Sequence, residues 1–226
     1  MDVRILEELT VRDFTKAAVD FRYLLNRAYP RKGALELVGN RYALTFDQRH
    51  LLHRGVFSES DAMSRRRKLL RLRDLRGRAL AIDGYNVLIT VEAGLSGRPL
   101  IAADDGFLRD ISGLSANFKK TPSTDHAIHL AFQTLRTAKP RDVLFLFDSP
   151  MSKSGRLAQE VRALLARETF SGDAQAMRVP EQILMGFQGI VATSDTAIID
   201  QSEKIFDLAG FILKQNVKPI SLLRLR

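Results

Sequence analysis

The spacing of apolar positions changes character near residue 78. Before that residue, apolar side chains recur every three or four positions, which is the spacing of one helix face. Pro30, Gly55 and Gly77 end three such stretches, whereas Gly39-Asn40 indicates a turn between short strands or within a loop that joins helices. We therefore interpret residues 1–77 as a small, mainly helical domain, with predicted helices over residues 10–30, 46–55 and 58–77.

After residue 78, short continuous apolar runs alternate with helical stretches. Continuous apolar strands are typically buried on both faces, and their alternation with helices indicates a parallel sheet covered by helices. We therefore expect an α/β fold, with a doubly wound, mostly parallel sheet, in a domain of residues 78–226. The predicted strands cover residues 79–82, 100–103, 143–147, 177–179, 190–192 and 220–223, and the predicted helices cover residues 124–138, 154–170, 180–186 and 198–214.

Positive charge is concentrated in the first third of the chain. Residues 1–78 hold 18 Lys and Arg against 10 Asp and Glu, whereas residues 79–226 hold 17 against 16. This asymmetry is typical of a domain that binds an acidic partner, with RNA first among the candidates, or of a solvated basic surface. The candidate RNA-binding residues are Arg65, Arg66, Arg67, Lys68, Arg71 and Arg73.

Composition excludes several classes of protein. The chain has no cysteine, which excludes disulfides, iron–sulfur clusters and thiolate zinc sites and favours a cytoplasmic location. No apolar run approaches the ~20 residues that a membrane span needs, and residues 1–14 lack the pattern of a secretory signal. We therefore expect no membrane partner.

Three predicted strands end in an aspartate: Asp83, Asp148 and Asp195. The carboxyl ends of parallel strands meet at one edge of a sheet, where ligands bind in α/β folds. Three carboxylates at one edge repel each other unless a divalent cation neutralises them, and oxygen ligands suit Mg²⁺ or Mn²⁺. The alternative for each aspartate alone is a turn or a helix cap.

The segments "AIDGYNVL", "LFLFDSP" and "VATSDTAIID" resemble the PIN-like nucleases, in the branch whose first strand ends in Asp-Gly-Tyr-Asn. The resemblance covers about residues 79–226 and implies a metal-dependent ribonuclease on a doubly wound parallel sheet. The whole chain also resembles an uncharacterised prokaryotic family with a basic helical N-terminal domain of unknown function, which implies no activity.

The resemblance implies a role for each matching residue. Asp83 would be the first metal ligand, with Asp148 and Asp195 as further catalytic carboxylates, and Ser194 would hold a carboxylate or a phosphate oxygen. Asn86 would hydrogen-bond the site or the phosphate, unless it is a turn residue. Further acids that could reach the cation are Asp200, which as an exposed helix acid could equally have no role, and Glu181, which an ordinary helix start would also favour.

Two segments depart from the nuclease pattern. In "GRPLIAADDGFLRDISG", Asp105 could be a further ligand and Arg109 a phosphate contact, or the segment could be a structural turn. In "SPMSKSGRLAQE", Ser152 and Ser154 precede a helix, so they could bind phosphate or simply cap the helix. The two histidine pairs, His50 with His53 and His126 with His129, lack a third ligand at zinc-like spacing and are interpreted as structural.

These observations favour an Mg²⁺- or Mn²⁺-dependent ribonuclease with a basic RNA-binding domain. The alternatives are a non-catalytic RNA- or ribosome-binding module, and a small-molecule phosphohydrolase or nucleotide-binding enzyme built around residues 149–155. The sequence leaves open which RNA is bound, whether one or two metals bind, whether the chain forms a homodimer, and whether residues 1–77 form a separate domain or a lid.

Overall fold

A computed structural model describes residues 11–111, 118–149, 151 and 153–225. The chain divides into two compact units. Unit 1 comprises residues 1–67, 99–112 and 221–226, and unit 2 comprises residues 68–98 and 113–220. This division differs from the predicted boundary at residue 77 in two respects: residues 68–77 fold with unit 2, and two short segments from the second part of the sequence fold with unit 1. The single helix expected over residues 58–77 is wrong, because a helix over Glu59–Lys68 is followed by a separate 3₁₀ helix, η2 (Leu72–Leu75).

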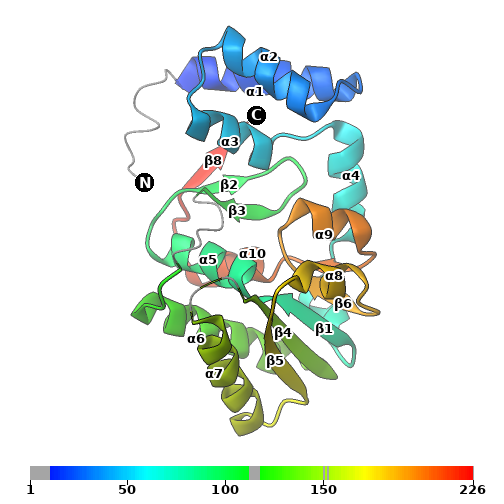
Figure 1. Ribbon diagram of the computed structural model, residues 1–226, viewed down its shortest axis with the longest axis vertical. Coiled ribbons are helices and arrows are strands. Elements are labelled where there is room, and N and C mark those ends of the chain that lie inside the picture. Colours follow the sequence, from blue (N-terminus) through cyan, green and yellow to red (C-terminus); the bar gives the residue numbers. More distant parts are fainter. Residues whose placement is uncertain (1–10, 112–117, 150, 152, 226) are drawn as a thin grey trace. The chain divides into compact units, whose positions relative to one another are not determined.

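Unit 1 combines helices with a small sheet. Its apolar core joins Phe21 and Leu52 of the helices to Ile101 and Leu225 from the later segments. The third helix begins with a capping box, in which the Thr45 side chain accepts a hydrogen bond from the Gln48 backbone and the Gln48 side chain accepts one from the Thr45 backbone. The helices are α1 (Val11–Asn26), α2 (Arg31–Arg41), α3 (Phe46–Gly55) and α4 (Glu59–Lys68) (Figure 1).

The three-stranded sheet of unit 1 corrects two predictions. The runs at residues 100–103 and 220–223 were expected in the large parallel sheet, but they contribute β2 (Leu100–Ala102) and β8 (Leu222–Arg224), which pair in parallel. β3 (Leu108–Asp110) pairs with β2 in antiparallel orientation. A third expectation, the turn at Gly39-Asn40, is also wrong, since α2 runs through both residues.

Unit 2 is built on a five-stranded sheet in which every neighbouring pair is parallel. The spatial order is β5-β4-β1-β6-β7. The chain runs from β1 outward to β4 and β5, and then crosses to β6 and β7 on the other side of β1. The order therefore reverses between β1 and β6, and the carboxyl ends of these two strands flank the switch point where α/β sheets bind ligands. The strands are β1 (Ala79–Asp83), β4 (Asp142–Asp148), β5 (Gly172–Met177), β6 (Ile190–Ala192) and β7 (Ile205–Phe206).

Helices connect the strands of unit 2, and right-handed crossovers put the two halves of such a sheet under opposite layers of helices. α10 packs on α5 and α6, while α8 packs on α9. The core is formed by apolar residues of the strands and of α5, α6, α7 and α10, among them Ile82, Leu88 and Phe132. The helices are α5 (Gly84–Leu95), α6 (Pro122–Ala138), α7 (Ser154–Arg167), α8 (Pro180–Met185), α9 (Thr196–Gln201) and α10 (Leu208–Asn216).

Two element predictions in unit 2 need correction. The single helix expected over residues 198–214 is two helices with β7 between them, and the Asp207 side chain caps the second by accepting a hydrogen bond from Gly210. Residues 172–174, expected as a loop, open the edge strand β5, which ends at Met177, where the predicted strand 177–179 was to begin. The expected fold class is confirmed: the chain is mixed α/β, with an N-terminal helical region followed by a mostly parallel sheet. Within the described residues, no helix has the length and apolarity needed to cross a membrane.

Candidate functional site

Asp83 lies at the carboxyl end of the central strand β1. In the register of the sheet it stands opposite Leu146 of β4, and α5 begins at the very next residue, Gly84. A Cβ atom on Gly84 would lie 2.3 Å from a ring carbon of Phe147 and 2.9 Å from the Leu146 carbonyl oxygen. The segment "DGYN" therefore combines a strand-end carboxylate with a glycine that lets α5 start directly against β4.

Hydrogen bonds connect the two sides of the switch point. The Thr193 hydroxyl donates to Asp83 Oδ2 at 2.8 Å and accepts from the backbone N–H of Asp195 at 3.0 Å. From the other side, Asn86 Oδ1 accepts hydrogen bonds from the backbone N–H and the hydroxyl of Ser194, at 2.8 and 2.9 Å. These bonds hold the end of β1 and the first turn of α5 against the segment that follows β6.

Asp195 has one engaged and one available carboxylate oxygen. Its Oδ1 caps α9 by accepting hydrogen bonds from the backbone N–H groups of Ala197 and Ile198, at 2.9 and 3.1 Å. Its Oδ2 has no hydrogen-bond partner among the residues that the structure describes. The capping alternative and the ligand prediction are therefore compatible, because a carboxylate can use one oxygen for each.

The pKa of Asp83 is raised to about 7. Burial is the largest cause, because it removes water from the charged form. The hydrogen bond from Thr193 opposes this rise in pKa, as does the backbone N–H of Asn86, while the negative charges of Asp195 and Glu181 reinforce it. Asp83, Asp195 and Glu181 thus lie within electrostatic reach of one another, and near neutral pH the Asp83 carboxyl exchanges between its acid and its anion.

Asp148 ends β4 and is coupled to Tyr85 in the first turn of α5. Burial, followed by the charge of Asp148, raises the pKa of Tyr85 to about 12, so its phenol is protonated at neutral pH. The Tyr85 hydroxyl and Asp148 Oδ1 are both buried, and neither has a hydrogen-bond partner in the described part of the chain. Buried polar atoms are normally hydrogen-bonded, so this pair marks a second polar point at the same edge of the sheet.

Two carboxylates at the switch point could hold a divalent cation together with a substrate. No three His, Asp or Glu side chains within residues 11–111, 118–149, 151 and 153–225 are arranged to hold a metal. Mg²⁺, however, is usually bound by one or two carboxylates together with substrate phosphates and water. Asp195 Oδ2 and the Asp83 carboxyl, whose anion is destabilised by burial and like charge, supply two such donors. Asp200 is exposed on α9, and its backbone carbonyl accepts a hydrogen bond from Lys68.

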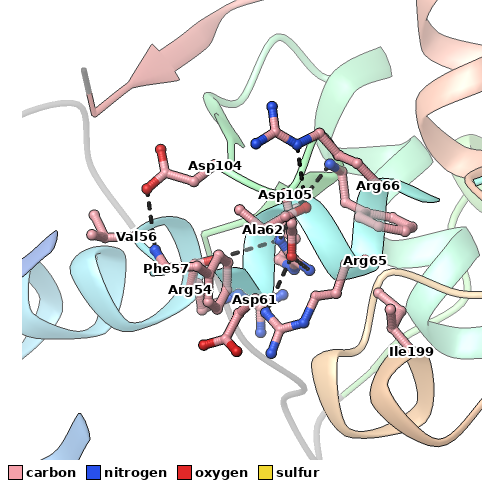
Figure 2. Close-up of polar contacts among 12 residues, drawn as sticks. Arg54, Val56, Phe57, Asp61, Ala62, Arg65, Arg66, Asp104, Asp105 and Ile199 are labelled. Carbon is pink, nitrogen blue, oxygen red and sulfur yellow. Dashed lines mark hydrogen bonds and ion pairs between the residues drawn. The ribbon is translucent and has the colours of Figure 1, made fainter. Parts of the chain in front are cut away.

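Asp105 and Arg109, expected as ligand and phosphate contact, pair with each other inside unit 1. Arg109 makes two hydrogen bonds of 2.8 Å to the Asp105 carboxylate, and both side chains are buried. Arg65, expected to bind RNA, is buried too and lies 3.3 Å from the same carboxylate (Figure 2). The guanidinium groups of Arg65 and Arg109 also lie over the ring of Phe57. Because Arg65 lies in a run of basic residues on a predicted helix, the sequence predicted an exposed side chain. That prediction is wrong, because its partner Asp105 is 40 residues away in the sequence.

The other candidate residues fall into three groups. Lys68 donates hydrogen bonds to the carbonyls of Ile199 and Asp200 and so caps the end of α9. The Ser154 hydroxyl is buried and donates to the Ser149 carbonyl at 3.3 Å, so it is not presented to a phosphate; Ser152 lies outside the described residues. The exposed candidates are Arg66, Arg67, Arg71 and Arg73.

Sequence reasoning missed Thr193 and Tyr85. Thr193 directly precedes the predicted pair Ser194 and Asp195, and Tyr85 lies within the quoted "IDGYN". The sequence signal for Thr193 is a polar residue directly after a buried strand, but its position opposite Asp83 depends on the register of β1 against β6, in which Ile82 pairs with Ala192. Tyr85 gave no comparable signal, because an aromatic side chain at the start of a buried helix is usually part of the core.

Comparisons with known proteins place the chain in a family. A family model described as "Domain of unknown function (DUF5616)" matches residues 72–211, and one described as "Protein of unknown function (DUF434)" matches residues 13–68. "Uncharacterized protein MJ0935" of Methanocaldococcus jannaschii is 34% identical over 190 residues, which cover 84% of this chain and 90% of the relative. No solved structure matches. The first model spans more than half of the chain, and the chain therefore belongs to the family of the domain of unknown function DUF5616.

Proposed function

We propose that this protein is an Mg²⁺- or Mn²⁺-dependent ribonuclease that hydrolyses RNA phosphodiester bonds at the switch point of unit 2. The observation that carries the proposal is the pair of carboxylates at the ends of β1 and β6. Asp83 and Asp195 are held on the two sides of the switch point by Thr193, although the charge of Asp195 raises the pKa of Asp83. Such a pair of like charges is stabilised by a divalent cation.

Each residue around the pair has a definable role in that reaction. Asp83 and Asp195 would hold the cation, which would lower the pKa of a bound water and neutralise charge on the phosphate. The Thr193 hydroxyl fixes the orientation of Asp83. Asn86 and Ser194 keep α5 in place against the segment after β6. Glu181, half-buried and within electrostatic reach of Asp83, adds negative charge that favours a cation.

The distribution of charge supports RNA as the substrate. The exposed side chains of Arg66, Arg67, Arg71 and Arg73 follow one another closely in the sequence. Neutralising phosphates with such residues supplies affinity that does not depend on sequence and that falls steeply with salt. Arg65 and Lys68 are engaged within the protein and are left out of the proposed RNA contacts.

Cleavage of end-labelled single-stranded RNA tests the proposal. The purified protein would be incubated with Mn²⁺, Mg²⁺ or EDTA beside two variants, Asp83→Asn and Asp142→Asn. Asp142 opens β4 at the opposite end of the same sheet, so its variant is a matched control for loss of one carboxylate. We expect cutting that requires the cation, falls at least about a hundredfold in Asp83→Asn, and persists in Asp142→Asn.

Two results would overturn the proposal. Cutting that is equal in EDTA, or equal in Asp83→Asn, would show that the nuclease activity does not come from this site. A shift of RNA on a native gel without cutting under any cation would favour a non-catalytic RNA-binding module.

A further inference from the structure

A cavity of about 510 Å³ in unit 2 has a basic lining. Its apolar wall includes Tyr85 and Phe118, whose rings meet edge to face with centroids 4.9 Å apart. Its polar lining is dominated by cations from the segment before α6 and from the start of α7: Lys119, Lys120, Lys153 and Arg156. A volume of this size accommodates a small ligand such as one nucleotide.

Two of the four cations have no counter-ion among the described residues. Lys120 is bound by Asp125 and Glu160, at 2.7 and 2.5 Å, and Arg156 lies 3.5 Å from Glu160. Lys119 and Lys153 are exposed and form no ion pair in the described part of the chain. Among the described residues, Lys119 and Lys153 therefore add two positive charges without an ion-pair partner to the cavity.

The start of α7 borders the same cavity, through Lys153, Arg156 and Leu157. The N-cap residue is Lys153, in the left-handed conformation with φ 64°, and its side chain does not cap the helix. The first N–H groups of a helix have no partner within the helix, and together with the helix dipole they favour an anion. α7 is 14 residues long, so this dipole is fully developed.

Tyr85 supplies an independent sign of a missing polar partner. Its side chain is 2% exposed, it lines the cavity, and its hydroxyl has no hydrogen-bond partner among the described residues. A buried hydroxyl without a partner costs free energy. A bound ligand with a polar group would remove that cost.

We infer that this cavity binds the phosphorylated terminal nucleotide of an RNA strand. The phosphate would lie between Lys119, Lys153 and the start of α7, and the nucleoside would lie against Phe118. A terminal phosphate carries up to two negative charges, which match the two positive charges of Lys119 and Lys153, whereas an internal phosphodiester carries one. The inference rests on the proposed ribonuclease function, because Tyr85, which lines the cavity, belongs to the first turn of α5, two residues after Asp83.

Fluorescence anisotropy in EDTA tests the inference without any cleavage. Short single-stranded RNAs of one sequence would carry a 5′-phosphate, a 3′-phosphate or two terminal hydroxyls. The double variant Lys119→Gln/Lys153→Gln would be compared with the matched control Lys204→Gln/Lys214→Gln, which removes two exposed lysines outside the cavity lining. We expect one terminal phosphate to tighten binding about tenfold in the wild type and the control, and less than twofold in the cavity variant.

Equal affinity for phosphorylated and hydroxyl-ended RNA would overturn the inference, as would a preference that survives in the cavity variant. The two RNA ends distinguish 5′ from 3′ recognition. Binding that prefers a terminal phosphate without any cutting in Mn²⁺ would keep this inference and reject the ribonuclease. Cutting that is lost in Asp83→Asn, without a preference for phosphorylated ends, would keep the ribonuclease and reject this inference.

Discussion

Replacing Asp83 with Asn should change how the stability of this protein depends on pH. The pKa of Asp83 rises from 3.8 to about 7 in the folded state. Between these values the folded state holds a proton that the unfolded state has released. The free energy of unfolding of the wild type therefore falls as the pH rises from 4 to 7, and this contribution is constant below and above that window.

The size of this effect follows from the shift. Each unit of pKa corresponds to about 1.4 kcal/mol, so the full window is worth about 4 kcal/mol as an upper bound. Between pH 5 and pH 8 the wild type should lose about 2.5 kcal/mol through this one group. Asparagine does not titrate, so Asp83→Asn should lack this loss and should be the more stable protein at pH 8.

Urea denaturation in EDTA at pH 5 and pH 8 measures the difference. All other titrating groups are shared, so comparing the wild type with Asp83→Asn isolates the one carboxyl, and Asp142→Asn serves as the control that should follow the wild type. Adding Mn²⁺ at pH 8 should then stabilise the wild type and not Asp83→Asn, because a cation that binds only the folded state stabilises it. The same change between pH 5 and pH 8 in the wild type and Asp83→Asn would refute this reasoning.

Three further substitutions test the packing and hydrogen bonds behind the fold and the site. Thr193→Val removes the donor to Asp83, so the midpoint of the pH dependence of unfolding should move above 7, and Thr193→Ser should restore it; an unchanged midpoint in Val would show that this bond does not tune the carboxyl. Arg109→Met removes one partner of the buried Asp105 and should lower the free energy of unfolding by about 3–5 kcal/mol. The control Arg141→Met, at an exposed ion pair, should lower it by less than about 1 kcal/mol. Equal losses of the two variants in urea denaturation would contradict a stabilising role of the buried pair. Gly84→Ala forces a Cβ against Phe147 and should cost about 1–3 kcal/mol, which thermal denaturation would detect, while no loss would show that α5 can shift away from β4.

The sequence predicted the elements that are defined by local pattern. The run that ends at Asp83 is continuous and apolar, and it is the central strand of the sheet. The predictions failed where pairing is non-local. Residues 100–103 and 220–223 look like core strands, but they pair with each other in unit 1, and nothing in either run specifies its partner. β5, with the sequence "GDAQAM", lies at the edge of the sheet, where burial on one side leaves little apolar signal.

The candidate site was predictable in the same uneven way. Asp83 and Asp195 could be placed at one sheet edge from strand ends alone, because parallel strands align their carboxyl ends. Thr193 could not be ranked, since its role depends on the register of β1 against β6. Arg65 was misjudged because a basic run is usually exposed, whereas here Asp105 and Phe57 bury its guanidinium. A partner distant in sequence decides whether such a charge faces solvent.

Binding of Mn²⁺ by isothermal titration calorimetry tests the central claim, that the carboxylates at the switch point hold a divalent cation. The titration would be run at pH 7 in buffers of different ionisation enthalpy, with wild type, Asp83→Asn and Asp142→Asn. We predict binding in the wild type and in Asp142→Asn that releases about half a proton per bound ion, because the pKa of Asp83 is about 7, and no binding in Asp83→Asn. Equal binding in all three proteins, or none in the wild type, would contradict the claim.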